Sequence, residues 1–103
     1  MKNIFENIPD NFSEELFETI AKSDNVKIEK IISDGHTSPP DFWYDQDQNE
    51  FVIILKGTAV LEFEDGKTVD MNEGDYLIIP AHQKHRVSYT DTSRKTVWLA
   101  VFY

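Results

Sequence analysis

The segment "GDYLIIPAHQKHRVSYT", Gly74 to Thr90, contains the clearest structural signals in the chain. A short apolar run, "YLII", precedes a proline-containing segment, and then "HRVSYT" alternates polar residues with His85, Val87 and Tyr89. Successive side chains of a strand point to opposite faces of its sheet. Because the other three residues of "HRVSYT" are polar and suited to water, we expect His85 to point into the protein together with Val87 and Tyr89.

A second histidine, His82, lies three positions before His85, so the two would face opposite sides of a continuous strand. His82 reaches the side of His85 only if "PAHQK" forms a turn, which Pro80 favours. Two interpretations of His85 therefore stay open: a core histidine satisfied by a hydrogen bond, or a member of a functional site.

Outward from this stretch, most of the chain has the same pattern of short strands split by turns. Gly35 and the pair Pro39-Pro40 place a loop over residues 33–41. We expect strands, or short extended segments, over residues 26–32, 42–44, 50–56, 58–64, 67–71, 76–80, 85–90 and 95–103. This spacing predicts an all-β sandwich or barrel.

Two of the expected strands, "FVIIL" (51–55) and "VWLAVFY" (97–103), are apolar on both faces. One face would fill the interior, and the other would be left in water unless something covers it. The cover is either the N-terminal segment or a second copy of the chain. Since one short N-terminal element covers little of a sheet, the pattern favours a homodimer.

The N-terminal residues 11–22, "NFSEELFETIAK", show a different periodicity. Phe12, Leu16 and Ile20 recur at every fourth position, which predicts a short amphipathic helix with Phe17 beside the same face. We therefore expect a single domain over 1–103, with a helical arm over 1–24 and a β-barrel over 25–103.

Composition excludes several classes of partner and chemistry. The 103 residues suit one domain, the net charge is −9, and there is no cysteine. Nucleic acids and anionic membranes both require a positive patch, so neither is expected as a partner. Without cysteine there is neither a disulfide framework nor a thiolate nucleophile or ligand. No apolar run is long enough to span a bilayer, and a cytoplasmic location is the default expectation.

The segments "YDQDQNEFVIILKG" (44–57) and "GDYLIIPAHQKHRVSY" (74–89) resemble the two sequence motifs of the cupin superfamily. Glu50 and Gly57 match the first motif, with six residues between them. Gly74, Pro80 and His85 match the second motif at the correct spacing. The resemblance implies a jelly-roll barrel, frequently dimeric, with a site inside the mouth of the barrel. More narrowly, "GHTSPPDFWYDQ", "PAHQKHRV" and the terminal "VWLAVFY" look like segments of small single-domain bacterial cupins that lack an established activity.

The resemblance also implies where a metal would bind. Cupin metal sites usually take two histidines and a glutamate from the first motif and one histidine from the second. Here the first-motif histidine positions fall on Tyr44 and Gln46, and His82 stands where the family usually has a glycine. A divalent transition metal (Zn, Mn, Ni or Fe) would thus need Glu50 and His85, and Gln46, Tyr44 or His82 would have to complete the ligand set.

Aromatic and polar side chains are expected to line the pocket around these residues. The candidates are Tyr44, Tyr89, His36 and Trp98. Such a pocket suits a small polar molecule. The first functional hypothesis is a metal-binding enzyme acting on that molecule, such as an isomerase, a lyase or an oxygenase. The second is a metal-free module for ligand binding or sensing, and the third is a structural or interaction protein that retains an unused pocket.

Overall fold

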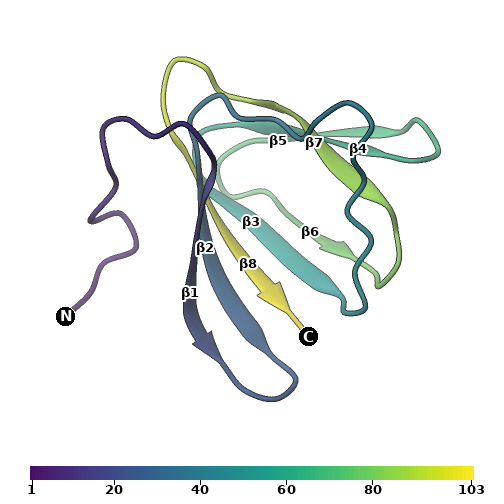
Figure 1. Cartoon of the computed structure of the whole chain (residues 1–103), viewed down its shortest axis with the longest axis horizontal. Coiled ribbons are helices and arrows are strands. Elements are labelled where there is room, and N and C mark those ends of the chain that lie inside the picture. The colour runs from purple at the N-terminus through teal and green to yellow at the C-terminus, as the bar shows by residue number, and fades with distance from the viewer.

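The computed structural model describes all residues from 1 to 103 and contains eight strands and no helix. The strands are β1 (Leu16–Lys22), β2 (Lys27–Ser33), β3 (Glu50–Lys56), β4 (Ala59–Phe63), β5 (Thr68–Met71), β6 (Tyr76–Ile79), β7 (His85–Thr90) and β8 (Thr96–Phe102). A five-stranded sheet in the order β1-β2-β8-β3-β6 faces a three-stranded sheet in the order β5-β4-β7. Figure 1 shows the two sheets as two layers that meet at an angle.

The all-β prediction is confirmed, and β3 and β7 have the expected bounds. Side chains alternate along β3, with Val52 and Ile54 buried between the sheets. The buried core they form joins both sheets through Leu61, Met71 and Trp98. The expected extended segment over 42–44 makes only an isolated bridge at Tyr44.

The predicted N-terminal helix is wrong, because residues 16–22 form β1, the edge strand of the larger sheet, antiparallel to β2. The spacing of Phe12, Leu16 and Ile20 fits a helix, but an isolated helix of three turns is marginal in water. Pairing with β2 satisfies the backbone of this segment, and strand alternation sends Phe17 inward and Leu16 to the other face. Long-range pairing thus overrides the local periodicity.

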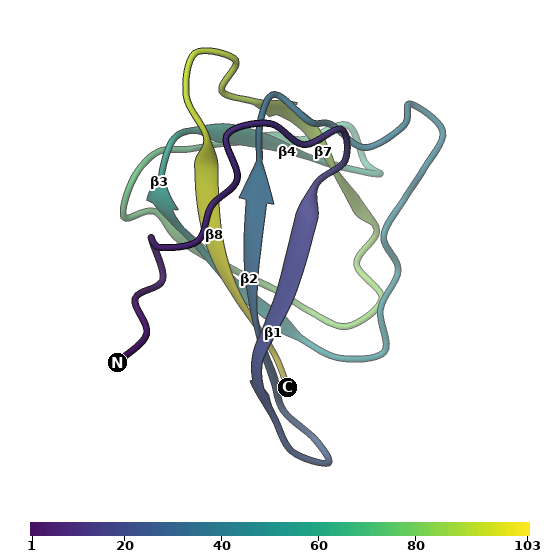
Figure 2. The same cartoon turned by 60° about the vertical axis from the view of Figure 1, so that its left-hand side comes forward.

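The segment before β1 runs along the outer side of the larger sheet (Figure 2). The Lys30 ammonium donates a hydrogen bond to the Glu6 carbonyl, and the Lys56 ammonium lies 4.5 Å from the centre of the Phe5 ring. This segment covers part of the apolar outer face. Tyr76 and Ile78 of β6 nevertheless remain 65% and 53% exposed.

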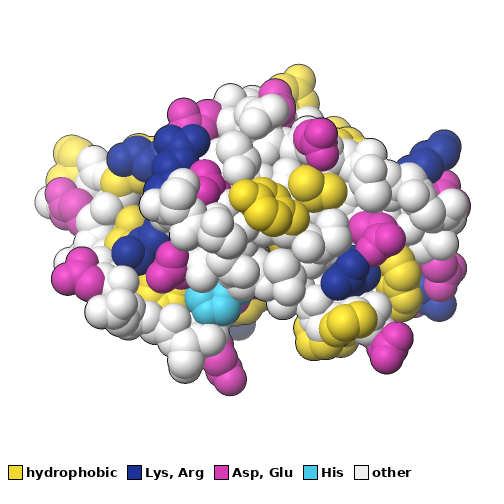
Figure 3. All heavy atoms as spheres, turned by 90° about the horizontal axis from the view of Figure 1, so that it is seen from above, with side chains coloured by type: hydrophobic (Ala, Val, Ile, Leu, Met, Phe, Trp, Pro, Cys, Tyr) yellow, Lys and Arg dark blue, Asp and Glu magenta, His cyan; other side chains and the backbone are white.

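The surface carries the negative charge that the composition requires. Figure 3 shows acidic side chains spread over the upper face, with the hydrophobic ones in small separate groups. No helix in the structure could cross a membrane.

Candidate functional site

Two ionisable side chains from opposite sheets meet inside the barrel. Glu50 is the first residue of β3, between β8 and β6, and His85 is the first residue of β7. His85 Nε2 lies 3.4 Å from Glu50 Oε1, and the two side chains are only 6% and 10% exposed. Burying two charges is costly unless they are paired, so this contact fixes their protonation together.

The protonation of His85 follows from its second nitrogen. Nδ1 lies 2.9 Å from the Gln83 carbonyl, which can only accept, so Nδ1 carries a proton. Burial acts to lower the pKa of His85, but the Glu50 carboxylate and the Gln83 carbonyl together outweigh burial and raise it. Below this raised pKa, Nε2 also carries a proton, and the contact is an imidazolium–carboxylate ion pair.

The pair lines a cavity of about 580 Å³ between the two sheets. This volume is within the range of small-molecule sites. Apolar side chains from both sheets form much of its wall, and the core residues Val52, Leu61 and Trp98 belong to it. The cavity is therefore a continuation of the hydrophobic core, with a charged pair set into it.

The first-motif positions Tyr44 and Gln46 also line the cavity. Tyr44 exchanges two backbone hydrogen bonds with His85, and its ring stacks on the imidazole with centroids 5.5 Å apart. Burial and the nearby carboxylates of Glu15, Glu50 and Glu29 raise the pKa of the Tyr44 phenol. Tyr44 is thus a neutral wall residue that holds His85 in place.

His82 lies outside the cavity. Its backbone has a φ of 65°, the left-handed conformation that favours glycine, which explains why the resembling family usually has glycine there. The ring is 65% exposed, with Nδ1 2.9 Å from Asp45 and Nε2 3.7 Å from Asp47. The expected turn forms, but it turns this histidine away from Glu50.

Of the other expected wall residues, the structure brings Trp98 into the cavity but neither Tyr89 nor His36. A β-bulge between β4 and β7 shifts the register after Val87 and reverses the alternation, so Tyr89 is 43% exposed and Thr90 is buried. The His36 ring accepts a hydrogen bond from the Asp34 amide and stacks on Phe12.

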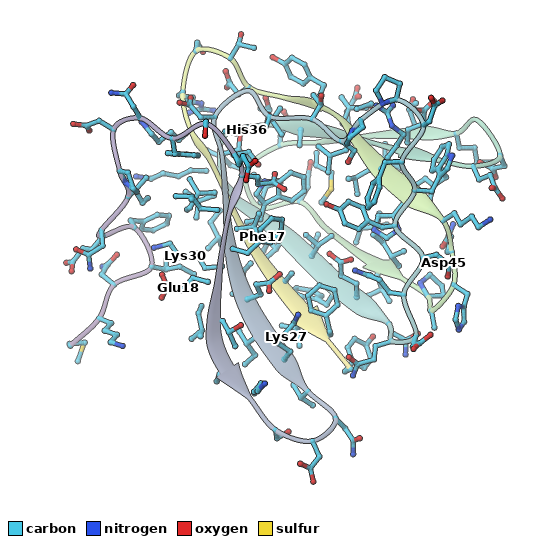
Figure 4. All side chains as sticks on the ribbon, in the orientation of Figure 1. Phe17, Glu18, Lys27, Lys30, His36 and Asp45 are labelled. Atoms are coloured by element: carbon cyan, nitrogen blue, oxygen red, sulfur yellow. The ribbon has the colours of Figure 1, made fainter.

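Five wall residues from β1, β2 and the segment before them were not expected: Glu15, Phe17, Lys27, Glu29 and Ile31. Figure 4 shows Phe17 and Lys27 on the opposite side of the β1–β2 ribbon from Glu18 and Lys30, with Asp45 across the opening. A helical interpretation of residues 11–22 hides this wall, because Glu15 and Phe17, two positions apart, share a face in a strand but not in a helix.

Glu15 is a second carboxyl group in the cavity. It accepts a short hydrogen bond from the Ser33 hydroxyl, which itself accepts one from the Trp98 indole. Burial raises the pKa of Glu15, although the Ser33 hydrogen bond and the nearby His36 oppose the shift. The polar chain Glu15–Ser33–Trp98 gives the indole N–H a fixed environment at the cavity wall.

The donor set does not fit a closed transition-metal site. Structural and catalytic zinc sites use three or four strong ligands. No group of three or more His, Asp or Glu side chains converges in a way that could hold a metal ion. Glu50 and His85 are strong donors, whereas the Gln46 amide is a weak one and His82 is elsewhere.

Comparison with known proteins places this geometry in a family. A family model described as "Cupin domain" matches residues 30–102. A crystal structure from Ralstonia eutropha JMP134, described as a "putative mannose-6-phosphate isomerase", is 43% identical, with a TM-score of 0.95 over 99% of this chain and 95% of that one. No curated protein matches the sequence.

More distant structures share the fold. A cupin superfamily protein from Desulfitobacterium hafniense DCB-2 is 24% identical, with a TM-score of 0.76 over 92% of this chain and 82% of that one. An RmlC-like cupin from Desulfovibrio desulfuricans is 16% identical, with a TM-score of 0.76 over 99% of this chain and 94% of that one.

Proposed function

This chain belongs to the cupin family, and from that premise we propose that it binds a small polar organic molecule inside its barrel, beside the Glu50–His85 ion pair. The observation that carries the proposal is the position of this pair in the wall of a cavity of about 580 Å³. The binding does not require a metal.

Stability alone gives little reason for such a pair. Replacing a buried ion pair with apolar residues of similar volume is often neutral or stabilising. Here the pair adjoins the core residue Val52 and the apolar wall of the cavity, where an aliphatic pair would also pack. An ion pair at a cavity wall offers a ligand both a donor and an acceptor, which apolar residues cannot.

An isomerase is the second candidate function, favoured by the description of the 43% identical protein. Moving a proton between two neighbouring atoms of a sugar needs a base and an acid that can both reach these atoms. The Glu50 carboxylate can accept a proton and the His85 imidazolium can donate one, and they lie side by side. This assignment needs no residue beyond the pair.

The test follows the Trp98 indole N–H by NMR while small molecules are added. Trp98 lines the cavity, and the chain's other tryptophan, Trp43, does not, so Trp43 is an internal control. The panel holds pairs that share a molecular frame and differ in charge: benzylamine and benzyl alcohol, n-butylamine and n-butanol, and mannose 6-phosphate and mannose. We expect at least one molecule to shift the Trp98 signal, with about tenfold weaker binding in Glu50→Gln.

The matched control is His82→Gly, which suits the left-handed backbone and removes a ring outside the cavity. It should bind as the wild type does. If no panel molecule shifts Trp98, or if Glu50→Gln binds equally well, the proposed site is wrong.

A divalent metal held by Gln46, Glu50 and His85 is the competing proposal, because all three line the same cavity. Thermal denaturation of tag-free protein with Zn²⁺, Mn²⁺ or Ni²⁺ separates the two. We expect each ion to change the midpoint of thermal denaturation by the same amount in the wild type and in His85→Ala. A stabilisation by any of these ions that disappears in His85→Ala would establish the metal site instead.

We further propose that a second copy covers the open outer face of the larger sheet. The outward side chains of β3 and β6 pair as Phe51 with Ile78 and Ile53 with Tyr76, and all four are uncharged. In a chain with a net charge of −9, this uncharged face on the edge strand offers the least repulsion between copies.

Sedimentation equilibrium tests this interface. We expect a dimer for the wild type and a monomer for Ile78→Asp, because a buried unpaired carboxylate opposes association. Ile20→Asp is the control: Ile20 is 48% exposed on β1, at the opposite edge of the sheet. A monomeric wild type, or an equal loss of dimer in both variants, would contradict the proposal.

A further inference from the structure

The charges of the cavity wall are strongly one-sided. Five carboxylates line it: Glu15, Glu29, Asp45, Asp47 and Glu50. The opposing cations are Lys27 and His85, and the wall contains no arginine. Both cations already have carboxylate partners, Lys27 with Glu29 and His85 with Glu50. Asp45 and Asp47 also contact His82, outside the cavity, but the carboxylates still outnumber the cations, so the free capacity of the wall is for positive charge.

The electrostatic environment of Tyr44 agrees with this excess of carboxylates over cations. Besides burial, three carboxylates on different elements raise the pKa of the Tyr44 phenol. A negative potential that disfavours a phenolate also disfavours a phosphate or carboxylate ligand. Arg86 and Arg94, which could recognise a phosphate, are paired with Glu62 and with Asp91 and Glu73 instead.

The chain itself shows how an ammonium group binds at this wall. Lys27 Nζ lies 3.4 Å from Glu29 and 4.8 Å from the centre of the Phe102 ring. A carboxylate beside an aromatic face is the usual way in which proteins recognise organic ammonium groups. Because the Lys27 side chain is 41% exposed, it can leave this position for solvent at modest cost.

We propose that the cavity binds a small organic cation whose primary ammonium group replaces that of Lys27 between Glu29 and Phe102. Its apolar body would lie against Ile31 and Trp98, which line the same wall. Lys27 is then an internal competitor that occupies the site until the ligand arrives. This proposal rests on the proposed function, since it names the ligand class of that cavity.

The same panel of pairs that differ in charge, followed at the Trp98 indole, tests the ligand class. We expect benzylamine and n-butylamine to bind at least tenfold more tightly than benzyl alcohol and n-butanol, and mannose 6-phosphate to bind more weakly than mannose. Lys27→Met should tighten benzylamine binding about two- to fivefold, because only a partly exposed ion pair is lost.

Removing the Glu29 carboxylate should weaken benzylamine binding, whereas removing the Lys27 ammonium should tighten it. Glu29→Gln should weaken benzylamine binding about tenfold, while Glu18→Gln should leave it unchanged. Glu18 is the matched control, because it points to the outer face from the adjacent strand (Figure 4). The benzyl alcohol titration should be the same in all three variants.

The outcomes separate the two proposals. The cation proposal is overturned if an alcohol or mannose 6-phosphate shifts the Trp98 indole signal at concentrations as low as the amines do. It is also overturned if Lys27→Met weakens benzylamine binding. In either case, the proposal that the cavity binds a small polar molecule is unaffected. If no molecule of any charge shifts Trp98, both are overturned.

Discussion

Replacing His85 with leucine should lower the free energy of unfolding by about 3–5 kcal/mol near pH 6. The substitution leaves Glu50 buried without its partner, in a side-chain environment that is only 10% exposed. The double variant Glu50→Met/His85→Leu should recover much of this loss, because it removes both charges and keeps the volume. Urea denaturation monitored by tryptophan fluorescence measures all three proteins.

The stability lost in His85→Leu should decrease as pH rises. The folded protein raises the pKa of His85 above its unfolded value of about 6.5, so the stabilisation is complete below that pH and disappears as pH rises through the folded pKa. The difference between the wild type and His85→Leu should therefore shrink from pH 6 to pH 9. A difference that grows over this interval, or a single variant as stable as the double variant, would contradict the ion pair.

Gly57→Ala should be the most damaging substitution of a single small residue, at about 3–5 kcal/mol. Gly57 has a φ of +85°, and a Cβ there would lie 2.7 Å from the Thr96 Cα and closer still to its hydroxyl. Backbone strain and steric overlap add, and Thr96 is fully buried, so it has no room to move. Thermal and urea denaturation give the loss directly.

Gly66→Ala separates these two costs. Gly66 has a φ of +91°, but nothing lies within 4 Å of the position its Cβ would take. Gly66→Ala should lower the free energy of unfolding only by the cost of placing alanine at a positive φ, about 1–2 kcal/mol. Equal losses in the two variants would show that the contact with Thr96 does not limit Gly57. The close approach of β8 explains why the first cupin motif ends in glycine at this position.

Most of the strands could be predicted because their signals are local. The apolar run in "EFVIILK", the alternation in "HRVSYT" and the turns around them predict β3 and β7 with the bounds that the structure has. β1 could not be predicted this way, because the periodicity of "NFSEELFETIAK" indicates a helix. This segment forms a strand because it pairs with β2. The turn at residues 23–26 brings the two segments together.

The candidate site was predictable only in its centre. Motif spacing pointed to Glu50 and His85, and strand parity aimed His85 inward, as the structure places it. The bulge that turns Tyr89 outward leaves no mark in the sequence, because one extra residue in a strand changes no local preference. The acidic wall from Glu15 and Glu29 depends on β1 and β2, so the error at β1 hid the charge of the cavity.

The protonation of His85, followed by ¹⁵N NMR of its ring from pH 5 to pH 9, tests whether Glu50 and His85 form an ion pair. The proposed ligand site depends on this pair, because it lines the cavity. We expect both ring nitrogens to be protonated at pH 6, with a midpoint above about 6.5 that falls in Glu50→Gln. A midpoint below 6.5 that Glu50→Gln leaves unchanged would contradict it.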